Sequence, residues 1–168
     1  MYPAPFEYSA PTTLEEATAL LAELGDEGRV LAGGQSLLPM MKLRLATPGH
    51  LVDINRIPGL DRIEHVDGHL QIGALVRHAD VVDSQEIADA SPLMASTAPW
   101  VADPLVRNRG TVCGSVAHCD PEGDWNSVML ALGAEVVAAS RHGERVIPIE
   151  DFVVDYFTNS LQAGEMVT

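Results

Sequence analysis

The pair Gly33-Gly34 constrains the fold of this chain more than any other feature. It follows a short apolar run, Val30 to Ala32, and precedes Ser36 and an apolar segment over residues 37–45. A strand, a glycine turn and a helix in that order predict an α/β unit. Glycines at such a turn let the backbone approach a bound phosphate group, and Ser36 can cap the helix and donate to the same oxygens. The pair also fits a plain tight turn, and it matches neither GxGxxG nor GxxxxGK[ST].

A second glycine-bearing segment lies far downstream. It reads RNRGTVCGS from Arg107 to Ser115 and is followed by Asp120-Pro121 and Asp124. Its guanidinium groups, hydroxyls and glycine amides are donors, and Asp124 can accept hydrogen bonds from ribose or ribityl hydroxyls. Together the two segments suit a dinucleotide ligand. Arg107 and Arg109 fit surface salt bridges on an acidic protein equally well.

The charge of the chain limits its partners. Its 168 residues include 10 Lys and Arg against 24 Asp and Glu, which gives a formal net charge of -14. Such a balance repels phosphate backbones and anionic membrane surfaces, so nucleic acid is not expected as a partner. A bound phosphate group therefore has to be held by local N–H groups and hydroxyls. The hydrophobic share of 46% is enough for one sizeable core or two small subdomains.

The cysteines and the N-terminal sequence argue against disulfide-rich, metal-binding, secreted and membrane-spanning proteins. Cys113 and Cys119 stand in no CxxC pair and at no metal-ligand spacing from a histidine, so we expect no disulfide framework and no metal site. The first residues lack the basic and apolar regions of a leader, and no stretch approaches the roughly 20 apolar residues that span a bilayer. We expect a cytoplasmic protein without membrane insertion.

The pattern along the chain changes character at Pro58-Gly59. Before it, a helix capped by Thr12 or Thr13 is predicted to run to Leu24, and a strand is predicted over residues 50–54. After it, Asp67-Gly68 predicts a hairpin turn between strands 62–66 and 70–72, and His142-Gly143 predicts a second between 135–139 and 145–149. Helices are predicted over 78–82, 91–101 and 124–132. We therefore predict two units, residues 1–57 and 58–168.

The end of the chain carries a further signal. Gly164-Glu165 predicts a turn into another strand that begins near Met166, and the sequence ends at Thr168. On this pattern we expect a longer parent protein.

Three segments resemble one known family. AGGQSLLPMMKLRLA, from Ala32 to Ala46, resembles the flavin loop of the molybdopterin dehydrogenase FAD-binding family. RNRGTVCGSVAHCDP, from Arg107 to Pro121, resembles the second FAD loop of that family, and IGALVRHAD, from Ile72 to Asp80, resembles the connector between the loops. Two long motifs in the right order are more specific than either glycine pair. Within the family, the chain is similar to the medium, flavoprotein subunits of carbon monoxide dehydrogenase and xanthine dehydrogenase-type molybdenum hydroxylases.

The resemblance implies a fold and an activity. The fold is α+β (α/β) of the PCMH type, with a small parallel-sheet α/β subdomain, a larger and mostly antiparallel-sheet subdomain, and a noncovalent FAD between them. The implied activity is that of an oxidoreductase component, which takes electrons from 2Fe-2S centres and passes them to an external acceptor such as a quinone, NAD or oxygen. The implied partners are a small 2Fe-2S subunit and a large molybdopterin subunit. The C-terminal domain of the family is absent from this sequence.

The resemblance also assigns cofactor-binding residues. They are Ala32, Gly33, Gly34, Gln35 and Ser36 in the first loop, Thr111, Val112, Cys113, Gly114 and Ser115 in the second, and Lys42, Asp120 and Asp124. The loops are expected to wrap the pyrophosphate, and Asp124 to hold the ribose hydroxyls of the adenosine. Lys42 matches a lysine near the flavin edge, although a solvated helix cation fits the position nearly as well. No catalytic acid or base is expected, because the six histidines have no partnered Ser or Cys motif.

The sequence departs from the family pattern at several positions. Cys113-Gly114 replaces a glycine pair, and a side chain at residue 113 would crowd the pyrophosphate if the turn required a positive φ there. Cys119 stands where alanine is common, and Glu122 adds a negative charge close to the phosphates. Gln35 takes the place of a histidine that tethers the flavin covalently in some members of the superfamily, so a noncovalent FAD is expected.

Two other functions also fit the sequence. A flavin-free assembly or docking module fits if Cys113 and Glu122 have degraded the second loop. A stand-alone flavin oxidoreductase would need a convergent acid and base pair, which the sequence does not offer.

Overall fold

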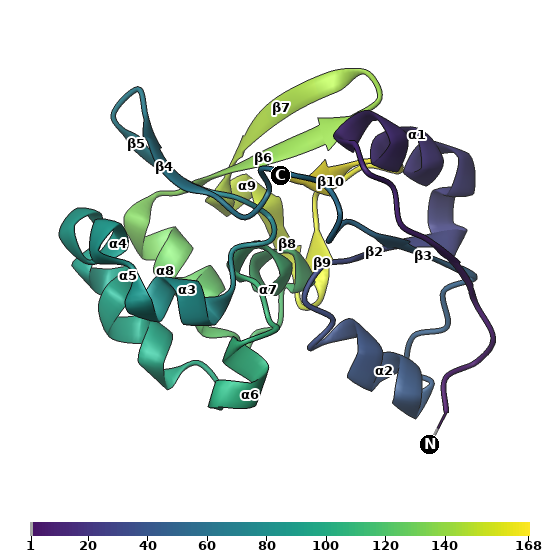
Figure 1. The fold of residues 1–168 in the computed structure, drawn as a ribbon, viewed down its shortest axis with the longest axis horizontal. Helices are drawn as coiled ribbons and strands as arrows, with labels where there is room; N and C mark the ends of the chain where they lie inside the picture. The colour runs from purple at the N-terminus through teal and green to yellow at the C-terminus, as the bar shows by residue number, and fades with distance from the viewer. Residues whose placement is uncertain (1) are drawn as a thin grey trace.

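The computed structural model describes residues 2–168, and its first unit is a small parallel sheet. Strands β1 (Glu7–Ser9), β2 (Gly28–Leu31) and β3 (His50–Asp53) lie in the order β1-β3-β2, and both neighbouring pairs are parallel. Parallel neighbours require crossover connections. Helix α1 (Leu14–Leu24) with the short 3-10 turn η1 (Gly25–Glu27) makes the first, and α2 (Leu37–Leu43) makes the second (Figure 1). The predicted strand, glycine turn and helix are confirmed.

The ends of α1 show why this helix forms where the sequence predicts it. The Thr13 hydroxyl accepts a hydrogen bond from the Glu16 amide at 3.1 Å, which caps the N-terminus. Gly25 ends the helix with a φ of 52°, a left-handed value that glycine adopts freely. Ala17 and Leu21 are buried on the face that packs on the sheet.

The second unit is built on antiparallel pairs. Strands β4 (Ile63–Val66) and β5 (His69–Ile72) form the first predicted hairpin, with φ of 51° at Asp67 and 84° at Gly68. Strands β6 (Glu135–Ser140), β7 (Gly143–Pro148) and β10 (Met166–Val167) form a sheet in the order β10-β6-β7, and β8 (Val153–Asp155) pairs with β9 (Thr158–Asn159). The predicted parallel and mostly antiparallel parts of the α+β fold are both present.

Helices fill one side of this second unit (Figure 1). They are α3 (His78–Asp83), α4 (Gln85–Ala90), α5 (Pro92–Thr97), η2 (Ala98–Trp100), α6 (Pro104–Arg107), α7 (Val112–His118), α8 (Asp124–Leu132) and α9 (Ile149–Phe152). The helix predicted over 124–132 is confirmed, and Gly133 ends it with a φ of 60°.

Several predicted boundaries were wrong. Helix α2 ends at Leu43 instead of Leu45, because Arg44 turns left-handed and its amide donates to the carbonyls of Met40 and Met41. The helix predicted over 91–101 is divided into α5 and the 3-10 turn η2. The turn of the second hairpin is Arg141-His142, since Gly143 already pairs with Ser140 in the sheet.

Two hydrophobic cores lie beneath these elements. The large core, which includes Val76, Ile87, Trp125 and Phe152, joins the helices of the second unit to β6 and β7. The small core consists of Ala17, Leu21, Val52, Ile54, Ile57, Ala74, Leu75 and Met166. It therefore includes residues from both sides of the predicted boundary at 57/58, and that boundary stays a prediction. No helix within residues 2–168 is long and apolar enough to cross a membrane.

Candidate functional site

A cleft of about 810 Å³ collects three segments that lie far apart in the sequence. The first glycine loop, residues 32–36, forms one wall. The second loop contributes Gly110, Thr111, Cys113, Gly114 and Ser115, and most of the C-terminal segment 157–167 forms a third wall. Small-molecule sites commonly have about this volume. The two glycine segments singled out in the sequence therefore face one common space.

The glycine pair of the first loop serves two different geometric needs. Gly33 is buried, and a Cβ atom on it would collide with the Arg109 carbonyl oxygen and lie 2.8 Å from the Gly110 Cα. Gly34 has a φ of 74°, and a Cβ there would lie 2.9 Å from Leu38 Cδ1. Gly33 thus permits direct contact between the two loops, and Gly34 permits the turn.

The first loop presents hydrogen-bond donors that the protein does not use. Within residues 2–168, the amides of Gly34, Gln35 and Ser36 donate to no protein acceptor. The Ser36 hydroxyl makes no capping bond to α2, contrary to the capping role predicted for it, and it remains available at the cleft. Gln35 Nε2 lies 3.4 Å from the Gly33 carbonyl oxygen. A row of free backbone amides is a site that suits an anion.

The second loop is the beginning of a helix instead of an open glycine loop. The Thr111 hydroxyl accepts from the Gly114 amide at 3.1 Å, and the Ser115 amide donates to the Thr111 carbonyl at 3.0 Å, so helix α7 starts here. The Ser115 hydroxyl lines the cleft and has no hydrogen-bond partner within residues 2–168. Fewer amides are free in this loop than in the first.

Cys113 does not have the positive φ that would make its side chain crowd a pyrophosphate. It lies in the first turn of α7 and is not among the residues with positive φ. Its Sγ lies 3.4 Å from the Ile72 carbonyl oxygen and 3.6 Å from that of Gly73, and burial raises the pKa of the thiol to about 12. The condition under which Cys113 would crowd a pyrophosphate is therefore not met.

The charged residues predicted to lie near the cofactor differ in whether they line the cleft. Asp124, in the first turn of α8, lines the cleft, and so does Glu122. Asp120 does not; its Oδ1 accepts from the Glu122 amide at 2.9 Å. Lys42 is exposed on α2 outside the cleft lining. The cofactor-binding roles of all these residues stay predictions.

Neither arginine of the second motif fits a salt bridge. Arg107 donates to the carbonyls of Val101 and Ala102 at 2.9 and 3.1 Å, which holds the loop before α6. Arg109 is exposed, and within residues 2–168 neither side chain has an ion-pair partner. Arg109 contributes to the site through its carbonyl oxygen, which contacts Gly33.

Two side chains that the sequence analysis did not single out connect the loops. The Arg77 guanidinium donates to the Arg109 carbonyl and to Asn55 Oδ1. Asn55 Nδ2 in turn donates to the Ala32 carbonyl at 2.8 Å. A carbonyl of the first loop is thereby tied to a carbonyl of the second. Arg77 lies in the connector motif IGALVRHAD, so the only available signal was the position of that motif between the loops.

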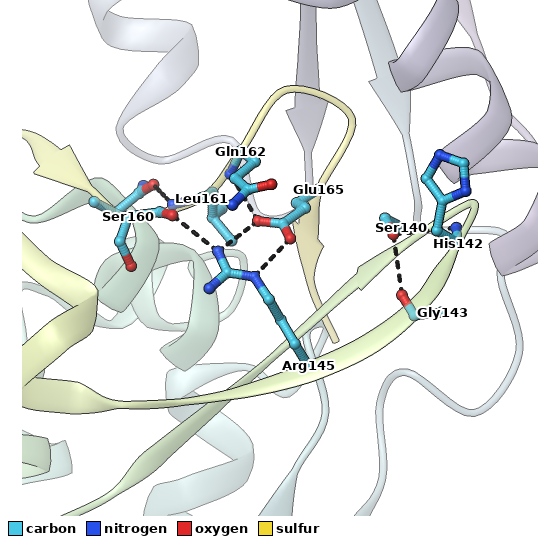
Figure 2. A network of polar contacts seen from close by, with 9 residues as sticks. Ser140, His142, Gly143, Arg145, Ser160, Leu161, Gln162 and Glu165 are labelled. Atoms are coloured by element: carbon cyan, nitrogen blue, oxygen red, sulfur yellow. Dashed lines mark hydrogen bonds and ion pairs between the residues drawn. The ribbon is translucent and has the colours of Figure 1, made fainter.

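An ion pair fastens the third wall of the cleft (Figure 2). Arg145 on β7 binds Glu165 at 2.7 Å through Nε and at 2.8 Å through Nη2, and Nη2 also donates to the Ser160 carbonyl at 2.9 Å. Glu165 Oε2 accepts from the Gln162 amide at 2.6 Å. The hydrogen bonds from Arg145 lower the pKa of Glu165. On the other side, Asn159 Nδ2 donates to the Ala117 carbonyl of α7 at 2.6 Å.

Comparisons with known proteins agree on one family. A family model described as the FAD binding domain in molybdopterin dehydrogenase matches residues 4–168. The chain is 44% identical over 167 residues to the 6-hydroxypseudooxynicotine dehydrogenase complex subunit alpha of Paenarthrobacter nicotinovorans, covering 99% of this chain and 56% of that subunit. It is 42% identical to the carbon monoxide dehydrogenase medium chain of Hydrogenophaga pseudoflava, covering 99% of this chain and 58% of that one.

Solved structures show the same likeness. The carbon monoxide dehydrogenase of Hydrogenophaga pseudoflava that lacks the Mo-pyranopterin moiety superposes with a TM-score of 0.96 at 43% identity, over 99% of this chain and 58% of the matched chain. The chain thus spans somewhat more than half the length of the relatives that it matches.

Proposed function

Because the chain belongs to the family of FAD-binding domains of molybdopterin dehydrogenases, we propose that it holds one noncovalent FAD in the cleft and forms the electron-transfer flavoprotein part of a molybdenum hydroxylase. One observation carries the proposal: the two glycine segments face the same cleft and contact each other through Gly33 and the Arg109 carbonyl.

The donor groups of the cleft suit the pyrophosphate of FAD. The free amides of Gly34, Gln35 and Ser36 and the hydroxyls of Ser36 and Ser115 are donors, whereas a pyrophosphate offers only acceptors. Asp124, in the first turn of α8, lines the cleft as an acceptor and suits ribose hydroxyls. Gln35 has no nucleophilic atom for a covalent flavin bond, which supports noncovalent binding.

The contribution of the chain is binding and orientation. Bound FAD would supply a two-electron carrier between the 2Fe-2S centres of a small subunit and an external acceptor such as a quinone, NAD or oxygen. The residues of the cleft would bind and orient the cofactor, and none of them is assigned an acid or base role. A large molybdopterin subunit would hold the site of substrate oxidation. The cytoplasmic location predicted from the sequence also stays a proposal.

Flavin titration of the purified protein tests this proposal. We expect a flavin absorbance spectrum that saturates at one FAD per chain. In the Ser36→Ala/Ser115→Ala double variant the Kd for FAD is expected to rise by about tenfold or more, because hydrogen bonds to charged groups are lost. Ser127→Ala, an exposed serine on α8, is the matched control and is expected to bind as the wild type does. A wild-type protein that binds no FAD would contradict the proposal and favour a docking module.

A further inference from the structure

His78 is a buried polar side chain at the cleft, and it has no role in the FAD site proposed above. It is the first residue of α3, only 5% exposed, and it lines the cleft. Its backbone amide donates to the Gly110 carbonyl at 3.0 Å, which places the imidazole against the second loop. It comes from the connector segment, so it is independent of both glycine loops.

Trp125 fixes the tautomer of this imidazole. The indole Nε1 donates to His78 Nδ1 at 3.0 Å, and the two rings lie nearly parallel, at 18°. An indole N–H is a donor only, so Nδ1 must carry the lone pair and a neutral His78 carries its proton on Nε2. Burial and the neighbouring guanidinium groups of Arg107 and Arg77 lower the pKa of His78 to about 4, which keeps the ring neutral at physiological pH.

The Nε2–H group of His78 has no acceptor within residues 2–168. Trp125 is the one hydrogen-bond partner of the ring among them, and it occupies Nδ1. Gly110 lies directly beside the other edge, where an added Cβ would be 2.8 Å from Nε2 and 2.9 Å from Cδ2. Gly110 therefore packs against this edge, and no larger residue fits there. The Nε2–H group is therefore free to donate to an acceptor atom of an occupant of the cleft.

We propose that His78 is a cofactor-binding residue whose Nε2–H donates a hydrogen bond to an acceptor atom of bound FAD. This inference rests on the proposed function and adds a third segment, the connector, to the two loops. Oxygens of the pyrophosphate and the sugar parts and ring nitrogens of FAD are all acceptors that a neutral imidazole N–H can reach without a charge of its own. Trp125 then explains the tautomer, and glycine at position 110 explains how the second loop lies against the imidazole.

Histidine-selective nitrogen NMR on the purified protein tests the proposal directly. Before FAD is added, the spectrum is expected to show His78 as the neutral Nε2–H tautomer. On addition of FAD, the Nε2–H proton signal is expected to shift in proportion to the bound fraction measured by absorbance. An Nδ1–H tautomer, or an Nε2–H signal that stays unchanged while FAD saturates, would overturn the proposal.

Two substitutions provide a second measurement. His78→Asn places its amide near the Nδ1 position, so it can still accept from Trp125, but it lacks the distal donor; we expect its Kd for FAD to rise by about threefold to tenfold. His78→Gln carries a donor near the Nε2 position and is expected to recover most of that loss. His69→Asn, on an exposed stretch of β5, is the matched control.

The outcomes separate this inference from the proposed function. If the wild type binds FAD while His78→Asn binds equally well and melts at the same temperature, the role of His78 is refuted and the FAD site stands. If the wild type binds no FAD, both fail. If His78→Asn does not fold, the NMR titration of the wild type alone decides.

Discussion

At the scale of single residues, Gly33 is the position where the fold and the site depend on each other most directly. In Gly33→Ala the added Cβ meets backbone atoms of Arg109 and Gly110, which cannot move aside as a flexible side chain would. We expect a loss of about 1 to 3 kcal/mol in the free energy of unfolding and weaker FAD binding, because the two loops are forced apart. Urea denaturation and FAD titration measure the two effects.

Gly68→Ala is the control for Gly33→Ala. Gly68 has a φ of 84° with no atom within 4 Å of an added Cβ, so alanine there introduces backbone strain without a collision. It is expected to destabilise the β4-β5 hairpin and leave FAD affinity unchanged. Equal FAD affinity in Gly33→Ala and the wild type would show that the contact between the loops does not shape the site.

The pKa of His78 gives a prediction for stability against pH. His78 ionises near pH 4 in the folded protein and near 6.5 when exposed, so the unfolded chain takes up its proton first as the pH falls. The contribution of the neutral ring to the free energy of unfolding is therefore fully present above about pH 6.5. It declines between pH 6.5 and pH 4, by up to about 1.4 kcal/mol per pH unit. Urea denaturation of the wild type and His78→Gln at pH 7, 6 and 5 isolates this contribution as the difference in slope. Parallel slopes would contradict it.

At the scale of elements, Arg77 joins the turn after β3 to the second loop. Arg77→Lys keeps the positive charge but lacks the planar fork that reaches Asn55 and the Arg109 carbonyl together. We expect the Kd for FAD to rise by about tenfold, because the two loops lose their common anchor. Arg62→Lys, an exposed arginine before β4, is expected to have no effect on FAD titration. If Arg77→Lys binds FAD as tightly as the wild type, the positive charge and not the planar guanidinium is required at position 77.

The Arg145–Glu165 pair makes a prediction for the C-terminal segment. Glu165→Gln removes the ion pair that anchors residues 160–165 to β7, so the amides of this segment are expected to exchange hydrogen faster at pH 7. Because the pKa of Glu165 is lowered in the folded state, the stabilisation by the pair is present above the usual glutamate pKa of 4.5 and is lost as the pH falls through the lower folded value. Glu150→Gln on α9 serves as control; exchange that is equally fast in both variants would count against the anchoring role.

The individual elements also show which parts of the fold could be predicted from the sequence. Helix α1, the β4-β5 hairpin and the end of α8 were predicted because their signals are local: a Thr13 cap, an Asp67-Gly68 turn and a Gly133 stop. Helix α6 (Pro104–Arg107) and strand β1 are too short to show a period; an Asp103 cap begins α6, and pairing with the distant β3 holds β1. Gly33 contacts the Arg109 carbonyl, which lies in a distant segment. The Nε2–H of His78 is free because Nδ1 accepts from Trp125. Such pairings become visible only in three dimensions.

At the scale of the whole molecule, both cores support the cleft. Met166 of β10 is buried in the small core while its strand pairs with β6 of the second sheet, so the C-terminal wall is held from both sides. The first loop follows β2 of the parallel sheet, the second begins α7, and Asn55 and Arg77 tie them together. The shape of the site is therefore a property of the folded chain as a whole.

The charge of the whole molecule opposes the ligand that the local geometry favours. The chain carries a formal net charge of -14, and the pyrophosphate of FAD is also negative, so the long-range field slows the encounter. Raising the ionic strength from about 0.01 to about 0.15 M shortens the Debye length from about 30 to about 8 Å and screens this repulsion. We therefore expect the association rate constant for FAD in stopped-flow fluorescence to rise severalfold, while the dissociation rate, which local hydrogen bonds set, changes little.

Uncharged riboflavin provides the control for this salt dependence, because it shares the flavin ring and lacks the phosphates. Any riboflavin association is expected to be nearly independent of salt. An FAD association rate that falls with added salt would mean that Arg77, Arg107 and Arg109 around the second loop create a local attraction strong enough to outweigh the net charge. The sign of the salt effect thus tells whether the cofactor is drawn in by a local field or held only by contact.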